Sequence, residues 1–485
     1  MSLGKKFCLI LCLFLSAAPA RAEDPVDLAT LHLRADPQSV TISGISSGAF
    51  MAAQFAVAWS SLIKGVGLIA GGPYYCARTN STGAVLTFGL LPTAVAVGPC
   101  MKGHAGPVSD FTAEADKLAA AGRIDPTDRL KSQKIYIFHG FNDKVVAPEL
   151  GSLTRDFYQH YLGDAGRNAL FYQTAVGAGH SFVVAQGAAA KDCAVNDRPY
   201  LDDCDYDQAG ILLEHFYGRL TPPGGQALSA TRKAFSQQPF IGDHAAPEEI
   251  GLADQGYVYV PESCKAGGCR LHVVLHGCLQ NAGEFLPDGQ AFLDGIGVNQ
   301  WADRNRIVVL YPQTTSGDGS WWHGTWNGFW PSFYRAPFNP EACWDWWGYV
   351  NYNDDYVTRS GAQIAAIKRM VDALTKDGQA TAPAAEPFDF KVIDASDVSA
   401  ALAWTPAAGA TSYEVFRAPR GGDFTSLGRT DSLSFVDDGL APNSAYRWRI
   451  VAHSADGATL AQADDAHSTR QTPHCADPGT CAWRP

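Results

Sequence analysis

The sequence predicts an α/β domain followed by a smaller all-β sandwich, and three patterns support that prediction. Before residue 380, buried apolar runs such as Ile135–Phe138 and Ile307–Tyr311 alternate with helical stretches such as Leu150–Tyr161. This alternation is typical of a sheet with helices on both faces. The segment Thr381–Pro387 is a short linker rich in proline and alanine. After it, short alternating runs separated by Gly, Pro and Asp turns indicate a β-sandwich.

The other expected elements follow the same periodicities in chain order. In the α/β part, the expected strands are Gln38–Ser43, Ala169–Tyr172 and Leu271–Leu275, and the expected helices are Ala49–Ala58, Asp110–Ala121 and Gly361–Lys376. In the C-terminal part, the expected strands are Ser399–Trp404, Ser412–Arg417 and Ala445–Ala452. The chain shows no internal repeat.

The first 22 residues predict export. Lys5 and Lys6 precede an apolar run from Phe7 to Leu15, and Ala20-Arg21-Ala22 fits a signal-peptidase site. The run is too short for a membrane anchor, so we expect a secreted protein, periplasmic or extracellular. The expected segments are a signal peptide at 1–22, an α/β domain at 23–380, the linker at 381–387, a β-sandwich at 388–470 and a short Cys-containing tail at 471–485.

The mature chain is strongly acidic. Loss of Lys5, Lys6 and Arg21 with no acid changes the net charge from −12 to −15. Such a charge argues against nucleic acid and anionic membranes as partners. It suits a secreted enzyme that acts on neutral or apolar material, and we expect a monomer.

Ten of the twelve cysteines remain after the signal peptide, an even number that suggests disulfides in an exported protein. Short loops favour the pairs Cys193–Cys204, Cys264–Cys269 and Cys475–Cys481, and the remaining cysteines would then pair as Cys76–Cys100 and Cys278–Cys343. Spacing leaves other connectivities open. A metal site is not favoured, because no C-x-x-C pair occurs and the cysteines do not cluster with histidines.

Residues 44–48 form the pattern G-x-S-x-G, with Ser46 at its centre. An expected strand precedes it and an expected helix follows it, which is the setting of a nucleophile elbow. In such a turn, small flanking residues let the helix pack against the strand while the serine hydroxyl is exposed. The pattern therefore predicts Ser46 as a nucleophile, and the alternative is a plain turn.

Two later loops could supply an acid and a base for Ser46. Asp143 follows the strand Ile135–Phe138, and His180 lies in a glycine-rich loop after another expected strand. The order Ser, Asp, His is that of α/β-hydrolases, and an Asp–His pair can activate a serine. The alternative for Asp143 is a loop cap beside Lys144. His139 is expected to lie too near Asp143 in the chain to be its partner.

A third loop, Leu275-His276-Gly277-Cys278, follows a buried strand and resembles the His-Gly loop that supplies an oxyanion-hole N–H in esterases. We expect the amides of Ser47 and Cys278 to bind the oxyanion, and His276 to contact substrate. This loop comes some 230 residues after Ser46, whereas in most hydrolases it comes before the nucleophile. Circular permutation of the sheet would explain the order.

Together, the Gly-Ile-Ser-Ser-Gly, Asn-Asp-Lys-Val-Val, Gly-Ala-Gly-His and Leu-His-Gly-Cys motifs resemble extracellular poly(3-hydroxybutyrate) depolymerases with a circularly permuted α/β-hydrolase domain. The resemblance covers residues 25 to about 375. It implies a Ser46/His180/Asp143 triad, an oxyanion hole at Ser47 and Cys278, and hydrolysis of short-chain polyhydroxyalkanoate esters, as polymer or oligomers, without metal or organic cofactor. The C-terminal part is similar to fibronectin type III domains, on Trp404 and the Leu440–Ala452 segment.

Seven of the twelve tryptophans lie within 27 consecutive residues: Trp321, Trp322, Trp326, Trp330, Trp344, Trp346 and Trp347. Glycines and prolines interrupt them, so they do not form a helical core stripe. Indole rings suit a surface that grips an apolar polyester, and we expect Trp346 and Trp347, near Cys343, to bind substrate. The alternative is that several are ordinary core residues.

Two other functions stay open at this point. The first is a carbohydrate esterase that removes feruloyl or acetyl groups, because such enzymes have related His-Gly-Cys loops. The second is a non-catalytic binding protein on a hydrolase scaffold, although all three triad positions carry competent residues.

Overall fold

The computed structural model describes residues 25–77, 90–164, 166–187, 189–284, 287–320, 323–327, 330–334, 336–351, 353–376, 390–395, 399–404, 407, 409–419, 422–441, 444–454 and 457–468. The predicted signal peptide, linker and tail, with Cys475 and Cys481, lie outside these residues. The chain divides into two compact units, Met1–Ala380 and Thr381–Pro485.

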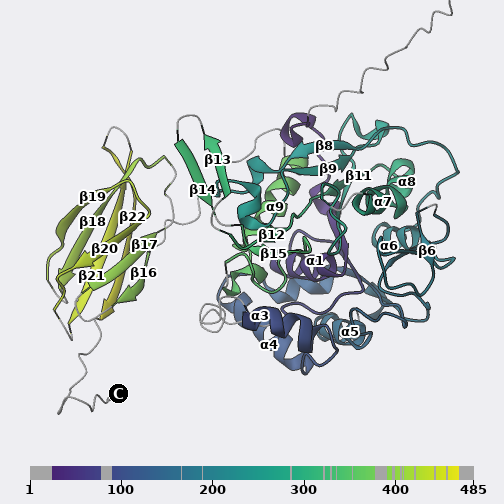
Figure 1. Cartoon of the computed structure of the whole chain (residues 1–485), viewed down its shortest axis with the longest axis horizontal. Helices are drawn as coiled ribbons and strands as arrows, with labels where there is room; N and C mark the ends of the chain where they lie inside the picture. Colours follow the sequence, from purple (N-terminus) through teal and green to yellow (C-terminus); the bar gives the residue numbers. More distant parts are fainter. Residues whose placement is uncertain are drawn as a thin grey trace, which may run out of the picture. The chain divides into compact units, whose positions relative to one another are not determined.

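The first unit is built on an eight-stranded sheet with the order β4-β3-β2-β1-β10-β11-β9-β8. Figure 1 labels three of its strands, β8, β9 and β11, and helices around the sheet. Its strands are β1 (Thr41–Ile45), β2 (Gly65–Ile69), β3 (Lys134–Phe138), β4 (Leu170–Gln173), β8 (Lys233–Ser236), β9 (Gln255–Tyr259), β10 (Arg270–Leu275) and β11 (Ile307–Tyr311). The strands from β4 to β11 in this order are parallel. Strand β9 pairs antiparallel with β11, and β8 pairs antiparallel with β9. The late strand β10 therefore lies directly beside β1.

Helices cover both faces of this sheet, as the sequence predicts. One face carries α1 (Ser47–Ala58), α4 (Val108–Ala120), α5 (Glu149–Leu162) and α9 (Ala362–Thr375), and the other carries α6 (Gln208–Tyr217), α7 (Asp288–Gly295) and α8 (Val298–Arg304). Alternate strand residues enter the two cores: Ile135 and Ile137 of β3 enter the first, and Tyr136 and Phe138 enter the second. Strand β3 is therefore buried on both sides, which explains its continuous apolar run.

The remaining elements of the first unit are short. Three strands, β5 (Phe182–Val184), β6 (Lys191–Asp192) and β7 (Leu201–Asp203), form a small sheet, and β12 (Gly317–Asp318) with β15 (Phe338–Asn339) and β13 (His323–Asn327) with β14 (Trp330–Tyr334) form two ribbons. The helix α3 (Leu90–Val95) runs into a π-helical turn, Ala96–Cys100. Single 3-10 turns are Leu28–Leu31, Pro37–Ser39, Thr127–Ser132, Arg167–Ala169, Gln238–Phe240, Pro247–Ile250, Glu262–Cys264 and Asp354–Val357. In the part of the chain that is described, no helix has the length and apolarity needed to cross a membrane.

Four of the five predicted disulfides are confirmed. They are Cys76–Cys100, Cys193–Cys204, Cys264–Cys269 and Cys278–Cys343. Cys76–Cys100 and Cys264–Cys269 are buried in the first core, and Cys278–Cys343 joins the loop after β10 to the segment that carries Trp346 and Trp347.

The second unit consists of two antiparallel sheets, β16-β17-β20 and β19-β18-β21-β22. Their strands are β16 (Phe390–Ala395), β17 (Ser399–Trp404), β18 (Ser412–Pro419), β19 (Thr425–Thr430), β20 (Ser434–Asp438), β21 (Ala445–His453) and β22 (Thr459–Ser468). Trp404 and Trp448 are buried in its core. The Tyr446 hydroxyl accepts the N–H of Ala441 at 3.0 Å. The predicted all-β character of this part is confirmed.

Candidate active site

Ser46 lies in a strained turn between β1 and α1. Its φ is +56°, a conformation that non-glycine residues adopt at an energetic cost. Glycines make the turn possible: a Cβ at Gly44 would lie 2.2 Å from Gly48 O, and a Cβ at Gly48 would lie 2.4 Å from His276 O. The turn therefore brings the N-terminus of α1 directly against the end of β10.

Asp143 and His180 form a buried pair. His180 Nδ1 lies 2.8 Å from Asp143 Oδ2, while Asp143 Oδ1 accepts the N–H groups of Val145 and Val146, each at 2.9 Å. Because the carboxylate accepts a hydrogen bond from the Nδ1–H of His180, the other ring nitrogen, Nε2, has a free lone pair that can take a proton from a substrate or nucleophile. The pair has the geometry of the acid and base in a serine triad.

His139 also contacts Asp143, so the expectation that it lies too close along the chain to be a partner was wrong. Its Nε2 is 3.3 Å from Asp143 Oδ2 and 3.0 Å from Val146 O. Both neighbours are acceptors, so Nε2 carries the hydrogen. Burial by itself would raise the pKa of Asp143, but His180 and His139 together hold that pKa well below its ordinary value. The carboxylate is therefore ionised at neutral pH.

Asn196 joins the two loops that carry this pair. Its Oδ1 accepts the backbone N–H of His180 at 2.9 Å and of Lys144 at 2.8 Å, and its Nδ2 donates to Asn142 O at 2.9 Å. Sequence reasoning missed Asn196, because it lies 16 residues beyond His180 in a segment without a motif. The Cys193–Cys204 disulfide beside it is the only sequence signal near this position.

Ser46 and His180 line one cavity of about 410 Å³. The same cavity is lined by Ser47 and Cys278 and by a largely apolar set of side chains: Ile45, Phe50, Ala96, Val97, Met101, Val145, Val146, Leu279, Phe338, Pro340, Trp346 and Trp347. The structure therefore brings together three loops that follow β1, β4 and β10. The cavity can take an apolar molecule that presents one polar centre to Ser46.

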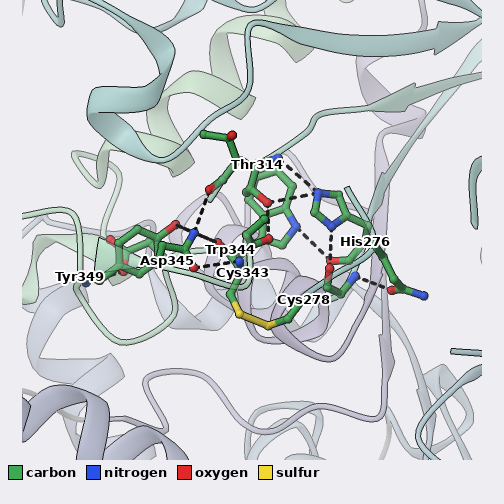
Figure 2. The surroundings of a disulfide bond; sticks show 12 residues. His276, Cys278, Thr314, Cys343, Trp344, Asp345 and Tyr349 are labelled. Atoms are coloured by element: carbon green, nitrogen blue, oxygen red, sulfur yellow. Dashed lines mark hydrogen bonds between the residues drawn. A yellow bond between two sulfur atoms is a disulfide. The ribbon is translucent and has the colours of Figure 1, made fainter. Parts of the chain in front are cut away.

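Side chains hold the His276-Gly277-Cys278 loop firmly in place (Figure 2). The Cys278–Cys343 disulfide anchors its end, Trp344 Nε1 donates to His276 O at 3.0 Å, and Gln280 Oε1 accepts the N–H of Gly277 at 2.7 Å. A rigid loop is what a preorganised oxyanion site requires.

Two amides at this cavity have no hydrogen-bond acceptor among the residues that the structure describes. The N–H of Ser47 lies in the first turn of α1, where amides have no partner within the helix. The N–H of Cys278 donates to no other residue in the described ranges. Cys278, Glu341 and Cys343 are close enough for a metal ion, but both sulfurs are in a disulfide and cannot serve as thiolate ligands.

His276 does not occupy the place expected of a substrate-binding residue. Its side chain is fully buried, and it is absent from the cavity lining. The expected direct contact with substrate is therefore corrected: the ring packs behind the loop, because strand β10 points it away from the cavity and toward Thr314.

Trp346 and Trp347 line the cavity, as expected for substrate contact. Trp346 stacks on Phe50 with ring centroids 4.1 Å apart.

The buried carboxylate of Asp345 accepts the N–H groups of Gly348 and Tyr349, each at 2.8 Å, and burial raises the pKa of Asp345 to about 7. Trp344 is a core residue. Trp321 and Trp322, and the side chains of the two tryptophans in β13 and β14, lie outside the described residues.

A strained serine between a parallel strand and a helix, with a His–Asp pair across an apolar cavity, is the arrangement of serine hydrolases built on an α/β sheet. The chain falls into this class.

Comparison with known proteins narrows the class. The chain is 36% identical over 437 residues to a poly(3-hydroxybutyrate) depolymerase of Delftia acidovorans, covering 88% of this chain and 78% of that protein. It is 34% identical over 349 residues to a polyhydroxybutyrate depolymerase of Talaromyces funiculosus, covering 71% and 91%. A solved serine-to-alanine variant of a PHB depolymerase, in complex with an R3HB trimer, matches with a TM-score of 0.59 and 32% identity over 72% of this chain and 98% of that chain.

No protein-family model matches the chain. From the identities and coverage of these relatives, the chain belongs to the family of poly(3-hydroxybutyrate) depolymerases. It is an ester hydrolase, and the family resemblance expected from its motifs is confirmed.

Proposed function

We propose that the chain hydrolyses the ester bonds of poly(3-hydroxybutyrate) and its oligomers. The observation that carries the proposal is that Ser46, Ser47, His180 and Cys278 line one largely apolar cavity. A repeating ester with short apolar side groups matches such a cavity, because it offers one carbonyl for attack and otherwise needs only nonpolar contact. The related structure with an R3HB trimer supports the same substrate class.

In the first half of the reaction, Ser46 is the nucleophile and His180 is the base. His180 Nε2 takes the Ser46 proton, Ser46 Oγ bonds to the ester carbonyl carbon, and the carbonyl oxygen becomes negative. Asp143 holds the ring in the required tautomer through its 2.8 Å bond to Nδ1 and stabilises the imidazolium. His180 then gives the proton to the leaving hydroxyl oxygen, which leaves an acyl-enzyme.

In the second half, water attacks the acyl-enzyme with His180 again as the base, and Ser46 recovers its proton as the 3-hydroxy acid end leaves. Both tetrahedral intermediates carry a negative oxygen, which the N–H groups of Ser47 and Cys278 bind. Loss of one such donor typically costs on the order of 10²–10³ in kcat. The strained backbone of Ser46 and the Cys278–Cys343 disulfide support this preorganisation.

We assign apolar contact with the polyester substrate to Trp346 and Trp347. Both rings line the cavity, and the stack of Trp346 on Phe50 leaves it rigid, so little side-chain entropy is lost when a polyester chain lies against it. Trp344 and His276 have no part in this contact.

The chain order, the second unit and the disulfides support one further assignment each. The position of β10 beside β1, although it follows β1 by more than 200 residues, supports a circularly permuted α/β-hydrolase sheet at 23–380. The two-sheet core with Trp404 and Trp448 supports a fibronectin type III-like module at 388–470. Four disulfides support export to an oxidising compartment.

A clearing assay on amorphous poly(3-hydroxybutyrate), with chromatography of the products, tests the proposal. We expect release of 3-hydroxybutyrate and its oligomers, and loss of release in Ser46→Ala. Release of ferulate or acetate from xylan without clearing of the polyester would point to a carbohydrate esterase. Absence of phosphonate labelling at Ser46 would point to a binding protein.

A further inference from the structure

The imidazole of His276 uses both ring nitrogens, and one of them holds the peptide that joins Gly277 to Cys278. Its Nδ1 lies 2.7 Å from Gly277 O, and its Nε2 lies 3.2 Å from the backbone N and 3.2 Å from Oγ1 of Thr314. Figure 2 shows the ring between Thr314 and the loop that ends at Cys278. Because the side chain is fully buried, water does not compete for these bonds.

The distances assign the tautomer of His276. A carbonyl oxygen can only accept, so Nδ1 must carry the hydrogen that bonds to Gly277 O. The neutral ring then has a lone pair at Nε2, which accepts the N–H of Thr314. Burial lowers the pKa of His276 to about 4, so the ring is neutral at pH 7 and keeps this arrangement.

The two peptides of the loop are held differently. In the His276–Gly277 peptide, the C=O accepts from Trp344 and the N–H donates to Gln280. In the Gly277–Cys278 peptide, only the C=O has partners among the described residues: it accepts from His276 Nδ1 at 2.7 Å and, at the longer distance of 3.3 Å, from the backbone N–H of Gln280. In a trans peptide the C=O and N–H point in opposite directions, so holding the C=O in the interior directs the Cys278 N–H away from it, toward the cavity that Cys278 lines.

We propose that His276 is a positioning residue of the oxyanion hole, which orients and polarises the Gly277–Cys278 peptide for its role as donor. A hydrogen bond accepted by the C=O strengthens the N–H of the same peptide as a donor. The loop passes close over the nucleophile, since a Cβ at Gly277 would lie 3.2 Å from Ser46 Cβ. The inference rests on the proposed function, in which the Cys278 amide binds the oxyanion.

Three substitutions of His276 distinguish the effect of its Nδ1–H donor from the effect of the rest of the ring. In His276→Asn, the side-chain amide nitrogen can take the place of Nδ1 and donate to Gly277 O. In His276→Gln, the amide lies one bond further out, near the place of Nε2, and in His276→Phe no donor remains. Two variants lack the donor, so failure of one to fold leaves the comparison intact.

His272 supplies a matched control on the same strand. It is also fully buried, but its ring nitrogens bond to Thr41 Oγ1 at 2.7 Å and Ser43 Oγ at 2.9 Å, within the sheet. His272→Asn and His272→Gln therefore report the general cost of replacing a buried imidazole in β10. We expect them to lower thermal stability and leave kcat unchanged.

The assay is steady-state hydrolysis of p-nitrophenyl butyrate at pH 7.5, with active sites counted by phosphonate titration. We expect kcat to fall about 10- to 100-fold in His276→Gln and His276→Phe, with KM within about threefold, while His276→Asn keeps kcat within about threefold of the wild type. Equal loss in His276→Asn and His276→Gln, a loss confined to KM, or an equal loss of kcat in the His272 variants would overturn the inference.

Inhibition by phenylboronic acid gives a second readout, because its tetrahedral adduct with Ser46 places an oxygen in the oxyanion hole. We expect its inhibition constant to rise in parallel with the fall in kcat, and an unchanged constant in His276→Gln and His276→Phe would contradict the inference. Failure of the proposed function is distinct: the wild type would then release no 3-hydroxybutyrate from polymer, although the small-ester and boronate results could still be read.

Discussion

The contact between Gly48 and the end of β10 makes a quantitative prediction for Gly48→Ala. A Cβ at Gly48 would lie 2.4 Å from His276 O and 2.5 Å from Leu275 O, whereas ordinary contact begins near 3.4 Å. Both atoms belong to the backbone, so the first turn of α1 and the end of β10 must separate by about 1 Å. That separation moves Ser46 and Ser47 away from the loop that carries Cys278. A misplacement of about 1 Å can cost on the order of 10²-fold in rate.

We therefore expect Gly48→Ala to lower kcat for p-nitrophenyl butyrate by about 10- to 100-fold. Overpacking costs about 1–3 kcal/mol, and the better helix propensity of alanine offsets about 1 kcal/mol of this, so the urea midpoint should fall modestly. Gly224→Ala is the control, because no atom lies within 4 Å of the Cβ it adds. A Gly48→Ala enzyme with kcat within threefold of wild type would refute the close packing of nucleophile turn and oxyanion loop.

Three further predictions follow from the site. Asp143→Asn should lower kcat about 10⁴-fold. Because the pKa of Asp143 is depressed in the fold, the contribution of Asp143 to the free energy of unfolding should be full above about pH 4 and shrink as pH falls further. A difference in stability between wild type and variant that does not change with pH would contradict this. Because burial raises the pKa of Asp345 to about 7, its contribution to the free energy of unfolding should fall as pH rises from about 4 to 7, so Asp345→Asn should gain stability relative to wild type over that range in urea titrations. Trp347→Ala should impair clearing of polymer more than hydrolysis of p-nitrophenyl butyrate, and equal losses would argue against a grip on the polymer.

The parts of the site that could be predicted from the sequence are those in which a chemically reactive residue lies within a recognisable local backbone pattern. The nucleophile turn needs a strand, two small residues and a helix in immediate succession, so Ser46 can be recognised from its neighbours alone. Asp143 and His180 follow strands, and the carboxyl ends of parallel strands gather at one edge of a sheet. The elements β3, β10, β11, α5 and α9 were predictable because continuous apolar runs and helical periodicity survive burial.

Other elements could not be predicted from the sequence, because their residues are set by contacts with segments that are distant in the chain. Strand β2 contains Gly65 and Gly67, which hide its strand pattern, and the reason is α6: a Cβ at Gly65 would lie 2.5 Å from Phe216 Cδ1, and a Cβ at Gly67 would lie 2.6 Å from Leu212 Cδ1. Asn196 reaches the Asp143 and His180 loops only after the chain has folded back across both.

By itself, the sequence predicted a serine hydrolase with Ser46, Asp143 and His180 as candidate catalytic groups, and an α/β part followed by an all-β part. It also favoured, through loop lengths, four disulfide pairs that the structure contains. Only the tertiary structure showed which groups each histidine contacts. His139, dismissed for its nearness in sequence, contacts the carboxylate because the loop after β3 turns back on itself. His276, expected to touch substrate, faces Thr314. Sequence spacing states how far apart two residues are along the chain, whereas the direction of a side chain depends on how the folded segments around it pack.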